Sequence, residues 1–361
     1  MAITGRTMIS HAGGKCGADL PGLIEKIAEA VDFRHNDCNQ HSSKEMKMGR
    51  KEMGLITKMY QDNFLQRFDK DKAVPYLGLS DFPGLICEKD TFRNSSGIMI
   101  RNFSYYYTGF VPDRIILFCP GIGPGHTAYM AEIETLCRSG YQVLTLDYSG
   151  CGDSGGERMP SVNAPLRDVM ELLDRLHPES EIIPVGHSLG GYTALCISNL
   201  LPDVKRAVII SGFVSISDEM IGFVRFRILA NRIKRFEKKL DPQYGLLDNL
   251  KYLQKTTDKL LWIHSTDDPM VNYEHNAGQV LKTQNPNIRV ITVEHKKHNP
   301  QYTEEALKTM NEWMGGYNRL IREKQFDTPE ARKAYFNDKP VRQMTEQDPA
   351  VMGEILRFIG S

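Results

Sequence analysis

A serine between two glycines, in the sequence Gly186-His-Ser188-Leu-Gly190, is the residue of this chain best suited to nucleophilic chemistry. The apolar run 182–185 before it is typical of a buried strand. Glycines two positions before and after the serine permit a sharp turn from strand into helix, which exposes the serine hydroxyl. That hydroxyl is barely ionised at neutral pH, so it needs a general base and a group that orients the base. The pattern therefore predicts attack on an acyl carbonyl, with the base and its partner supplied elsewhere in the chain.

Two later strand-like runs end in side chains that could be this base and its partner. One run opens into Asp267 and Asp268, and a carboxylate at the carboxyl end of a buried strand lies in the crevice where open α/β sheets hold their sites. The last strand-like run is followed by His295 and His298. Because His295 follows the strand too closely to reach far, we favour His298 as the base. On position alone, either aspartate could be the acid.

The order of these residues along the chain, Ser188, Asp268 and then His298, resembles the catalytic triad of the α/β-hydrolase superfamily. The resemblance is to the serine esterase, lipase and aminopeptidase branch and covers roughly residues 113–323. It places the acid three residues before an apolar residue, here Val271, and so favours Asp268. It implies an α/β fold with a mostly parallel central sheet, helices on both faces and a helical cap insertion.

A glycine-rich segment, residues 120–126, resembles the oxyanion loop of this superfamily. The resemblance implies that the backbone N–H groups of Ile122 and Leu189 hold the oxyanion, where preorganised donors contribute most to the rate. It also implies substrate-binding positions at Gly121, Gly123 and His126. For His126 a structural role competes with substrate contact. Many relatives begin this loop with His-Gly, whereas this chain begins it with Pro-Gly.

Other residues near these segments are expected to have structural roles. His187, next to the serine, and His264, within a strand-like run, are predicted to be packing residues. Residues 147–154 resemble the D-x-x-G-x-G-x-S turn of the superfamily, whose role there is scaffolding. Cys151 within this turn is predicted to be buried and inert rather than open to modification.

Composition excludes several classes of function. The chain has 361 residues with 45 basic and 45 acidic side chains, so no net charge favours binding to nucleic acid. Its 7 cysteines are scattered, without a C-x-x-C pair or metal-ligand spacing, which indicates reduced thiols in a cytoplasmic protein that needs neither metal nor cofactor. The amino terminus lacks the apolar stretch of a signal peptide, and we expect no membrane span.

The chain divides by pattern into a core and two extensions. Residues 1–72 are predicted to form a helical N-terminal extension, with helices over 20–31 and 42–65. Residues 73–324 form the predicted α/β-hydrolase core, which carries a cap insertion at 214–258, and residues 325–361 form a helical tail. The extension is interpreted as a helical layer packed on the core, with a lid or an oligomer contact as the alternative.

One helix of the predicted cap is amphipathic and basic. Its apolar face carries Phe226, Leu229, Ile233, Phe236 and Leu240, and its other face carries seven arginine and lysine side chains between positions 225 and 239. Such a helix can lie on an anionic membrane surface or attract a negatively charged substrate. More often the apolar stripe packs on the core and the charges lie in water, and we favour this interpretation.

The residues and the resemblance together predict a serine hydrolase that cleaves small-molecule carboxylic esters through an acyl-enzyme intermediate. Within the fold, the alternatives are a lysophospholipase or monoglyceride lipase, which the basic helix favours, and a serine aminopeptidase. A ligand-binding module that has kept a hydrolase pocket is the non-enzymatic alternative, because fold does not determine function. The oligomeric state is left open by the sequence.

Overall fold

The computed structural model describes residues 57–58, 60–70, 76–108, 114–216, 219, 227–245, 247–323, 325, 328–337 and 339–361. The predicted helix over residues 20–31, like most of the predicted extension 1–72, lies outside these residues. Of the second predicted helix, over 42–65, residues 57–58 and 60–65 are described; 57–58 and 60–64 are helical, whereas residue 65 is a bend.

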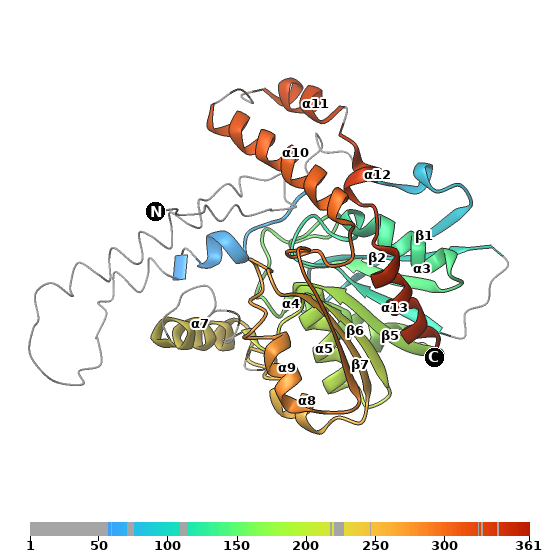
Figure 1. The fold of residues 1–361 in the computed structure, drawn as a ribbon. Helices are drawn as coiled ribbons and strands as arrows, with labels where there is room; N and C mark the ends of the chain where they lie inside the picture. The colour runs from blue at the N-terminus through green and yellow to red at the C-terminus, as the bar shows by residue number, and fades with distance from the viewer. Residues whose placement is uncertain are drawn as a thin grey trace, which may run out of the picture.

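An eight-stranded sheet in the order β1-β2-β4-β3-β5-β6-β7-β8 forms the centre of the fold (Figure 1). The strands are β1 Leu85–Arg93, β2 Met99–Tyr107, β3 Arg114–Cys119, β4 Gln142–Asp147, β5 Glu181–His187, β6 Arg206–Ile210, β7 Lys259–Ser265 and β8 Ile288–Val293. β2 is antiparallel to both of its neighbours, β1 and β4, whereas all pairs from β4 to β8 are parallel. The predicted α/β class with a mostly parallel sheet is confirmed.

Helices follow most of the parallel strands. The described helices and 3-10 turns are η1 Leu79–Asp81, η2 His126–Tyr129, α3 Met130–Arg138, α4 Ala164–Leu176, α5 Leu189–Leu200, α7 Arg227–Leu240, α8 Leu250–Lys255, α9 Ala277–Thr283, α10 Glu304–Arg322, α11 Pro329–Asn337, α12 Val341–Met344 and α13 Pro349–Gly360. A crossover helix between parallel strands packs on one face of the sheet. Here α3 and α13 cover one face, and α4 and α5 cover the other.

The central strands are nearly continuous apolar runs because both of their faces are buried. Along β3, Ile116 and Phe118 belong to the apolar cluster that includes α3 and α13, whereas Leu117 and Cys119 belong to the cluster that includes α4 and α5. This division follows from the period of two along a strand, which sends successive side chains to opposite faces. The sheet therefore separates two helical layers, each with its own apolar core.

Helix α13, which lies in the predicted tail 325–361, packs on the central sheet. Its side chains Val351, Met352, Ile355 and Ile359 are buried in the same cluster as strand residues of β3, β5, β6 and β7. The helix begins after Asp348, whose carboxylate accepts hydrogen bonds from the N–H groups of Ala350 and Val351. The tail therefore supplies part of the layer that covers one face of the sheet. The domain boundaries at 72/73 and 324/325 stay predictions.

Helices α10 and α11 lie beyond the end of the sheet, at the top of Figure 1. They lie between β8 and α13 along the chain, so the chain returns to the sheet with α13 only after these helices. α10 packs through Ala306, Leu307 and Met310 in a small cluster with Tyr302 and Met344. The first half of α10 thus packs against the segment before it and against α12.

Helix α7, which lies within the predicted cap insertion, is held to the rest of the fold by a buried carboxylate. Glu237 accepts hydrogen bonds from the Tyr60 hydroxyl at 2.7 Å and from the Val162 N–H at 3.2 Å. Ile233 is buried in the core cluster, and Phe236 packs against that cluster. Residues 225–226 and the side chains of 227–230, which the predicted amphipathic stripe also includes, lie outside the described part of the chain.

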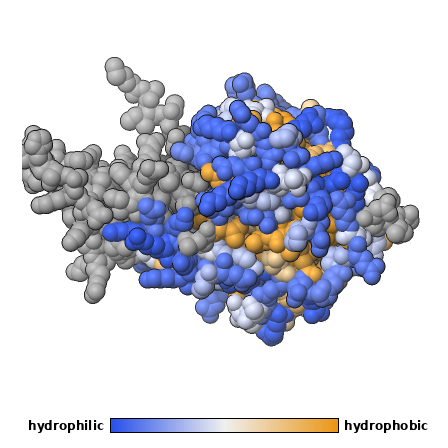
Figure 2. Space-filling model, turned by 90° about the horizontal axis from the view of Figure 1, so that it is seen from below, coloured by the Kyte–Doolittle hydropathy of each residue, from blue (hydrophilic) through white to orange (hydrophobic). Residues whose placement is uncertain are grey.

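No described helix is both long enough and apolar enough to cross a membrane. Figure 2 shows a mostly hydrophilic surface with an apolar area across the middle of the face seen from below. The large apolar side chains that are exposed in the described residues are Leu79, Leu176 and Leu281.

We expect Ile355→Ala to lower the free energy of unfolding by about 2–5 kcal/mol, because it removes buried methyl groups and leaves a cavity between α13 and the sheet. Ile355 is 1% exposed. The matched control is Leu281→Ala, a truncation at a side chain that is 48% exposed, with an expected change within about 0.5 kcal/mol. Urea unfolding measures both variants, and equal effects would contradict a core position for α13.

Glu237 gives a second expectation, for the pH dependence of stability. Burial raises the pKa of Glu237 to about 7 from its ordinary value of 4.5. Between these values the folded protein keeps a proton that the unfolded chain has lost, so stability falls as pH rises through this window.

We expect Glu237→Gln to remove this part of the fall, which is about 3 kcal/mol between pH 4.5 and pH 8. Unfolding in urea at several pH values measures it. Glu179→Gln, a change at an exposed glutamate, should leave the wild-type profile unaltered. A Glu237→Gln profile parallel to that of the wild type would show that Glu237 titrates normally.

Candidate active site

Ser188 lies at the turn between β5 and α5, with φ 58° and ψ −120°. A non-glycine residue in this left-handed region is strained, and such strain persists only where the surroundings enforce it. The Ser188 N–H donates to the carbonyl of Ile210 on the adjacent strand at 2.9 Å. A Cβ atom at Gly186 would collide with the backbone of Gly190, and one at Gly190 would collide with the carbonyl of Cys119. Both glycines are therefore required by the close approach of backbone around the turn.

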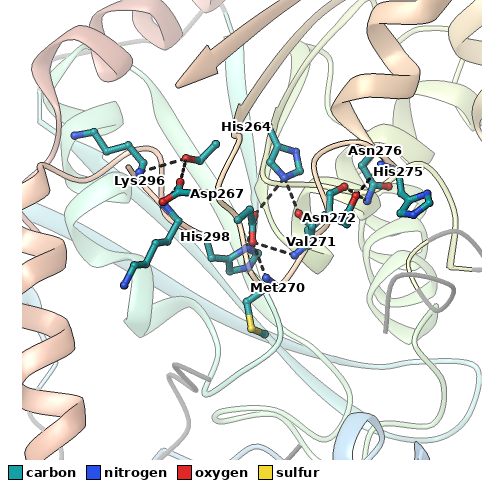
Figure 3. A network of polar contacts seen from close by, with 12 residues as sticks. His264, Asp267, Met270, Val271, Asn272, His275, Asn276, Lys296 and His298 are labelled. Atoms are coloured by element: carbon teal, nitrogen blue, oxygen red, sulfur yellow. Dashed lines mark hydrogen bonds and ion pairs between the residues drawn. The ribbon is translucent and has the colours of Figure 1, made fainter. Parts of the chain in front are cut away.

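Asp268 lies in the turn after β7 and is 8% exposed. Its Oδ1 accepts hydrogen bonds from the N–H groups of Met270 at 2.8 Å and Val271 at 3.0 Å. Its Oδ2 lies 2.9 Å from Nδ1 of His298 and 3.2 Å from Nε2 of His264. The contacts of His264 and His298 converge from opposite sides in Figure 3. The carboxylate is thus fixed by donors at both oxygens.

The surroundings of Asp268 favour its ionised form. Burial alone would raise the pKa of this carboxyl, but the attraction and hydrogen bonds of His298 and His264 outweigh it and hold the pKa well below its usual range. Because an ionised carboxylate only accepts hydrogen bonds, Nδ1 of His298 carries the proton in this pair. The other ring nitrogen of His298, Nε2, is then left as an acceptor.

His298 is held beside the serine turn by its main chain. Its carbonyl oxygen accepts a hydrogen bond from Nε2 of His187 at 2.7 Å, and the two imidazole rings lie 4.7 Å apart. His187 directly precedes Ser188, so three strand ends meet at this point: the ends of β5, β7 and β8. The structure therefore brings together the serine, aspartate and histidine regions that the sequence singled out.

The alternatives to Asp268 and His298 occupy different surroundings. Asp267 accepts hydrogen bonds from the Ser265 hydroxyl and from the Lys297 N–H. These bonds connect the turn after β7 to the turn after β8. His295 is exposed and has a positive φ of 61°. In the described residues, it is His298 and not His295 that bonds to an aspartate.

The loop that carries His298 is anchored to the segment before α13. Lys296 is 8% exposed, and its ammonium donates to the carbonyl of Tyr302 and to the carboxylate of Asp348, both at 2.9 Å. The Asp348 N–H donates in turn to the carbonyl of Gln301 at 2.8 Å. Asp348, the residue that caps α13, thus bonds both to Lys296 before His298 and to Gln301 after it.

The predicted oxyanion loop lies directly against the serine turn. A Cβ atom on Gly121 would lie 3.4 Å from Cβ of Ser188 and 3.2 Å from the carbonyl of His187. No residue in the described part of the chain accepts a hydrogen bond from the backbone N–H of Ile122 or of Leu189. The N–H of Gly121 is already bonded, to the Tyr129 hydroxyl at 3.0 Å. Ile122 and Leu189 therefore retain donors for another acceptor, and substrate contact by Gly121 and Gly123 stays a prediction.

His126 has internal partners for both ring nitrogens. Nδ1 lies 2.8 Å from the carboxylate of Asp147 and Nε2 lies 2.9 Å from the Tyr105 hydroxyl. Its ring packs on that of Phe103, with 3.8 Å between the centroids, and the residue is 2% exposed. These contacts favour the structural role for His126, and its predicted contact with substrate stays untested.

Comparisons with known proteins show what the chain is similar to. A family described as serine aminopeptidase, S33 (Hydrolase_4), matches residues 111–252. Lysophosphatidylserine lipase ABHD12 of Xenopus tropicalis is 30% identical over 156 residues, which are 39% of this chain and 38% of that protein. The mitochondrial palmitoyl-protein thioesterase ABHD10 of Homo sapiens is 31% identical over 119 residues, which are 31% of this chain and 37% of that protein. The chain belongs to the α/β-hydrolase superfamily.

The matched regions cover less than half of each curated relative, 38% and 37% of the two above. The family match includes Ser188 and the predicted oxyanion loop but ends at residue 252, before Asp268 and His298. Among solved structures, an esterase from Pyrococcus furiosus is 17% identical with a TM-score of 0.49, covering 72% of this chain and 97% of its own.

Two histidines of this α/β-hydrolase, His187 and His264, take part in polar contacts that the sequence did not predict. His187 bonds to the carbonyl of His298. His264 accepts a hydrogen bond from Trp262 Nε1 at 3.3 Å through Nδ1, and its Nε2 faces Asp268 and the carbonyl of Val271. Because a carbonyl only accepts, Nε2 carries the proton and stabilises the carboxylate of Asp268. The spacing of four residues between His264 and Asp268 was the only signal in the sequence, and the turn that brings them together was not readable.

Groups of three or more histidine, cysteine, aspartate or glutamate side chains that could hold a metal ion do not occur within the described residues. The described cysteines, Cys87, Cys119, Cys137, Cys151 and Cys196, are free. Cys151 is buried, and burial raises the pKa of its thiol, so it is not a reactive nucleophile.

Proposed function

We propose that this protein is a serine hydrolase that cleaves carboxylic esters through an acyl-enzyme intermediate. The observation that carries the proposal is the pair of Asp268 and His298, bonded at 2.9 Å and held against the residue before Ser188. A base that is oriented by an acid and lies beside a strained serine is the arrangement that nucleophilic acyl transfer requires.

In the proposed mechanism, Ser188 Oγ forms a bond to the acyl carbonyl carbon while His298 Nε2 takes the hydroxyl proton. The carbonyl electrons move to oxygen, and the N–H groups of Ile122 and Leu189 bind the resulting oxyanion. When the oxyanion collapses, the ester C–O bond breaks and His298 gives its proton to the leaving alcohol. Water then attacks the acyl-enzyme with the same base, releasing the acid and restoring Ser188.

Asp268 supports this cycle through its charge. Its low pKa keeps it ionised at neutral pH, so it attracts the imidazolium that forms on His298. His264, on the other side of the carboxylate, prevents Asp268 from turning away from His298. The acid therefore enters the reaction already oriented.

The names of the relatives support acyl substrates, since one is called a lipase and the other a thioesterase. A lysophospholipase or monoglyceride lipase is the second candidate, favoured by a specific feature of the cap. Ile233 and Phe236 direct one side of α7 to the core, while Arg235, Lys238 and Lys239 are exposed on the helix. These cations can attract a negatively charged headgroup at the protein surface.

We expect Ser188→Ala to abolish ester hydrolysis and Asp268→Asn to lower kcat by about 10³–10⁴-fold, because asparagine favours the wrong histidine tautomer. The measurement is hydrolysis of p-nitrophenyl butyrate, with folding checked by circular dichroism. Asp267→Asn is the matched control, because asparagine keeps the acceptor for Lys297, and its rate should stay within about threefold of the wild type. Turnover that persists in Ser188→Ala would refute the assignment.

The chain length of the acyl group separates the two candidate substrate classes. We expect kcat/KM to be higher for p-nitrophenyl butyrate than for the palmitate ester if a small acyl site is closed by the cap, each rate being corrected with Ser188→Ala. A preference for palmitate would instead favour the lipase. In that case Arg235→Glu combined with Lys239→Glu should lower the rate on an anionic lysophospholipid but not on a neutral monoglyceride.

A further inference from the structure

Two buried side chains, Tyr129 and His187, form a hydrogen-bonded connection between the loops of the candidate active site. The Gly121 N–H of the oxyanion loop donates to the Tyr129 hydroxyl at 3.0 Å. The same hydroxyl lies 3.0 Å from Nδ1 of His187, and Nε2 of His187 lies 2.7 Å from the carbonyl of His298. One continuous chain thus runs from the oxyanion loop through the serine turn to the loop that carries the base.

The direction of each hydrogen bond in this chain is determined by its ends. The carbonyl of His298 can only accept, so Nε2 of His187 carries a proton. In a neutral imidazole Nδ1 is then an acceptor, and it takes the proton of the Tyr129 hydroxyl. The lone pairs of that hydroxyl remain for the Gly121 N–H. Every donor is matched to one acceptor, which is the condition for a stable buried network.

Both side chains are shielded from solvent and take no part in the proposed chemistry. Tyr129 is 5% exposed and His187 is 2% exposed. Burial raises the pKa of the Tyr129 hydroxyl, so it keeps the proton that it donates to His187. His187 also packs on the His298 ring, with 4.7 Å between the centroids. The ring that is bonded to the base loop therefore also limits where the base can lie.

We propose that Tyr129 and His187 are positioning residues that fix the oxyanion loop and the His298 loop relative to Ser188. The inference rests on the proposed function, because it assigns a role to these residues in that same reaction. His187 is the neighbour of Ser188 in the chain, so its bond to the His298 carbonyl relates the base directly to the nucleophile. Tyr129 connects the backbone of Gly121 to the serine turn, because its hydroxyl bonds to both Gly121 and His187.

The role has a kinetic signature. A misplaced base slows the chemical step without changing the groups that bind substrate, and a displacement of about 1 Å can lower the rate about 100-fold. We expect His187→Ala to lower kcat by about 10–100-fold while KM changes less than about threefold. His187→Gln should recover most of the loss, since its amide N–H can donate to the His298 carbonyl and its oxygen can accept from Tyr129.

Tyr129→Phe and the double variant with His187→Ala test whether the two residues act as one chain. Removing the hydroxyl leaves the Gly121 N–H and His187 Nδ1 unmatched, so kcat should fall by about 10-fold or more. In the double variant the losses should not multiply, because either change alone already interrupts the connection. Multiplying losses, with no rescue by glutamine, would overturn the proposal in favour of two independent packing roles.

A readout that does not require turnover accompanies these rates. Hydrogen–deuterium exchange of the peptide over residues 294–302 should be faster in His187→Ala than in the wild type. In His187→Gln it should be slower than in His187→Ala. Tyr252→Phe is the matched control: its hydroxyl bonds to Ser198 and to Asp258, which lies just before the amino end of β7, the end opposite to the one that leads to Asp268. Its kcat and its exchange of 294–302 should therefore equal those of the wild type.

Labelling of the wild type with a fluorophosphonate separates failure of this inference from failure of the proposed function. Absence of both labelling at Ser188 and hydrolysis would refute the function, and the exchange of 294–302 would then decide the positioning role alone. If the wild type is labelled and active but His187→Ala has unchanged kcat and exchange, the inference is wrong. If His187→Ala does not fold, Tyr129→Phe and His187→Gln carry the same comparison.

Discussion

The hydrogen bond between Asp268 and His298 is the interaction on which the candidate site depends, because it joins the ends of β7 and β8 across the top of the sheet. An ionised carboxylate this deeply buried is costly unless donors surround it. Asp268 meets this constraint with two backbone N–H groups and two imidazoles. The same donors that make the buried charge tolerable also fix the direction in which it presents itself to His298.

The parallel sheet determines where this pair can form. β5, β7 and β8 run in the same direction, so the segments that leave their carboxyl ends converge although the chain reaches them far apart in sequence. The strained backbone of Ser188 is tolerated because its N–H is bonded to Ile210 and because glycines allow the backbone to close around it. The strained backbone at Ser188 is thus stabilised by the neighbouring parallel strand β6.

The features that the sequence predicted well are those set by local sterics and by the repeat of strand and helix. The sharp turn at Ser188 was predictable because only glycine fits at Gly186 and Gly190, and the sheet was predictable because its central strands are apolar on both faces. The contacts of His187 and His264 were not predicted, since both were expected only to pack. The bond of His187 reaches the carbonyl of a residue 111 positions away, and no local pattern encodes such a contact. The helix of the tail was predicted, but the sequence did not identify the sheet as the surface on which α13 packs.

The bond between Lys296 and Asp348 has a consequence for how the molecule matures during synthesis. The loop that carries His298 is secured by a residue that caps α13, and α13 follows that loop only after α10, α11 and α12. A nascent chain can emerge from the ribosome with its sheet paired and its serine turn formed while this loop still lacks its anchor. The order of translation therefore delays assembly of the site until the segment that caps α13 has been made.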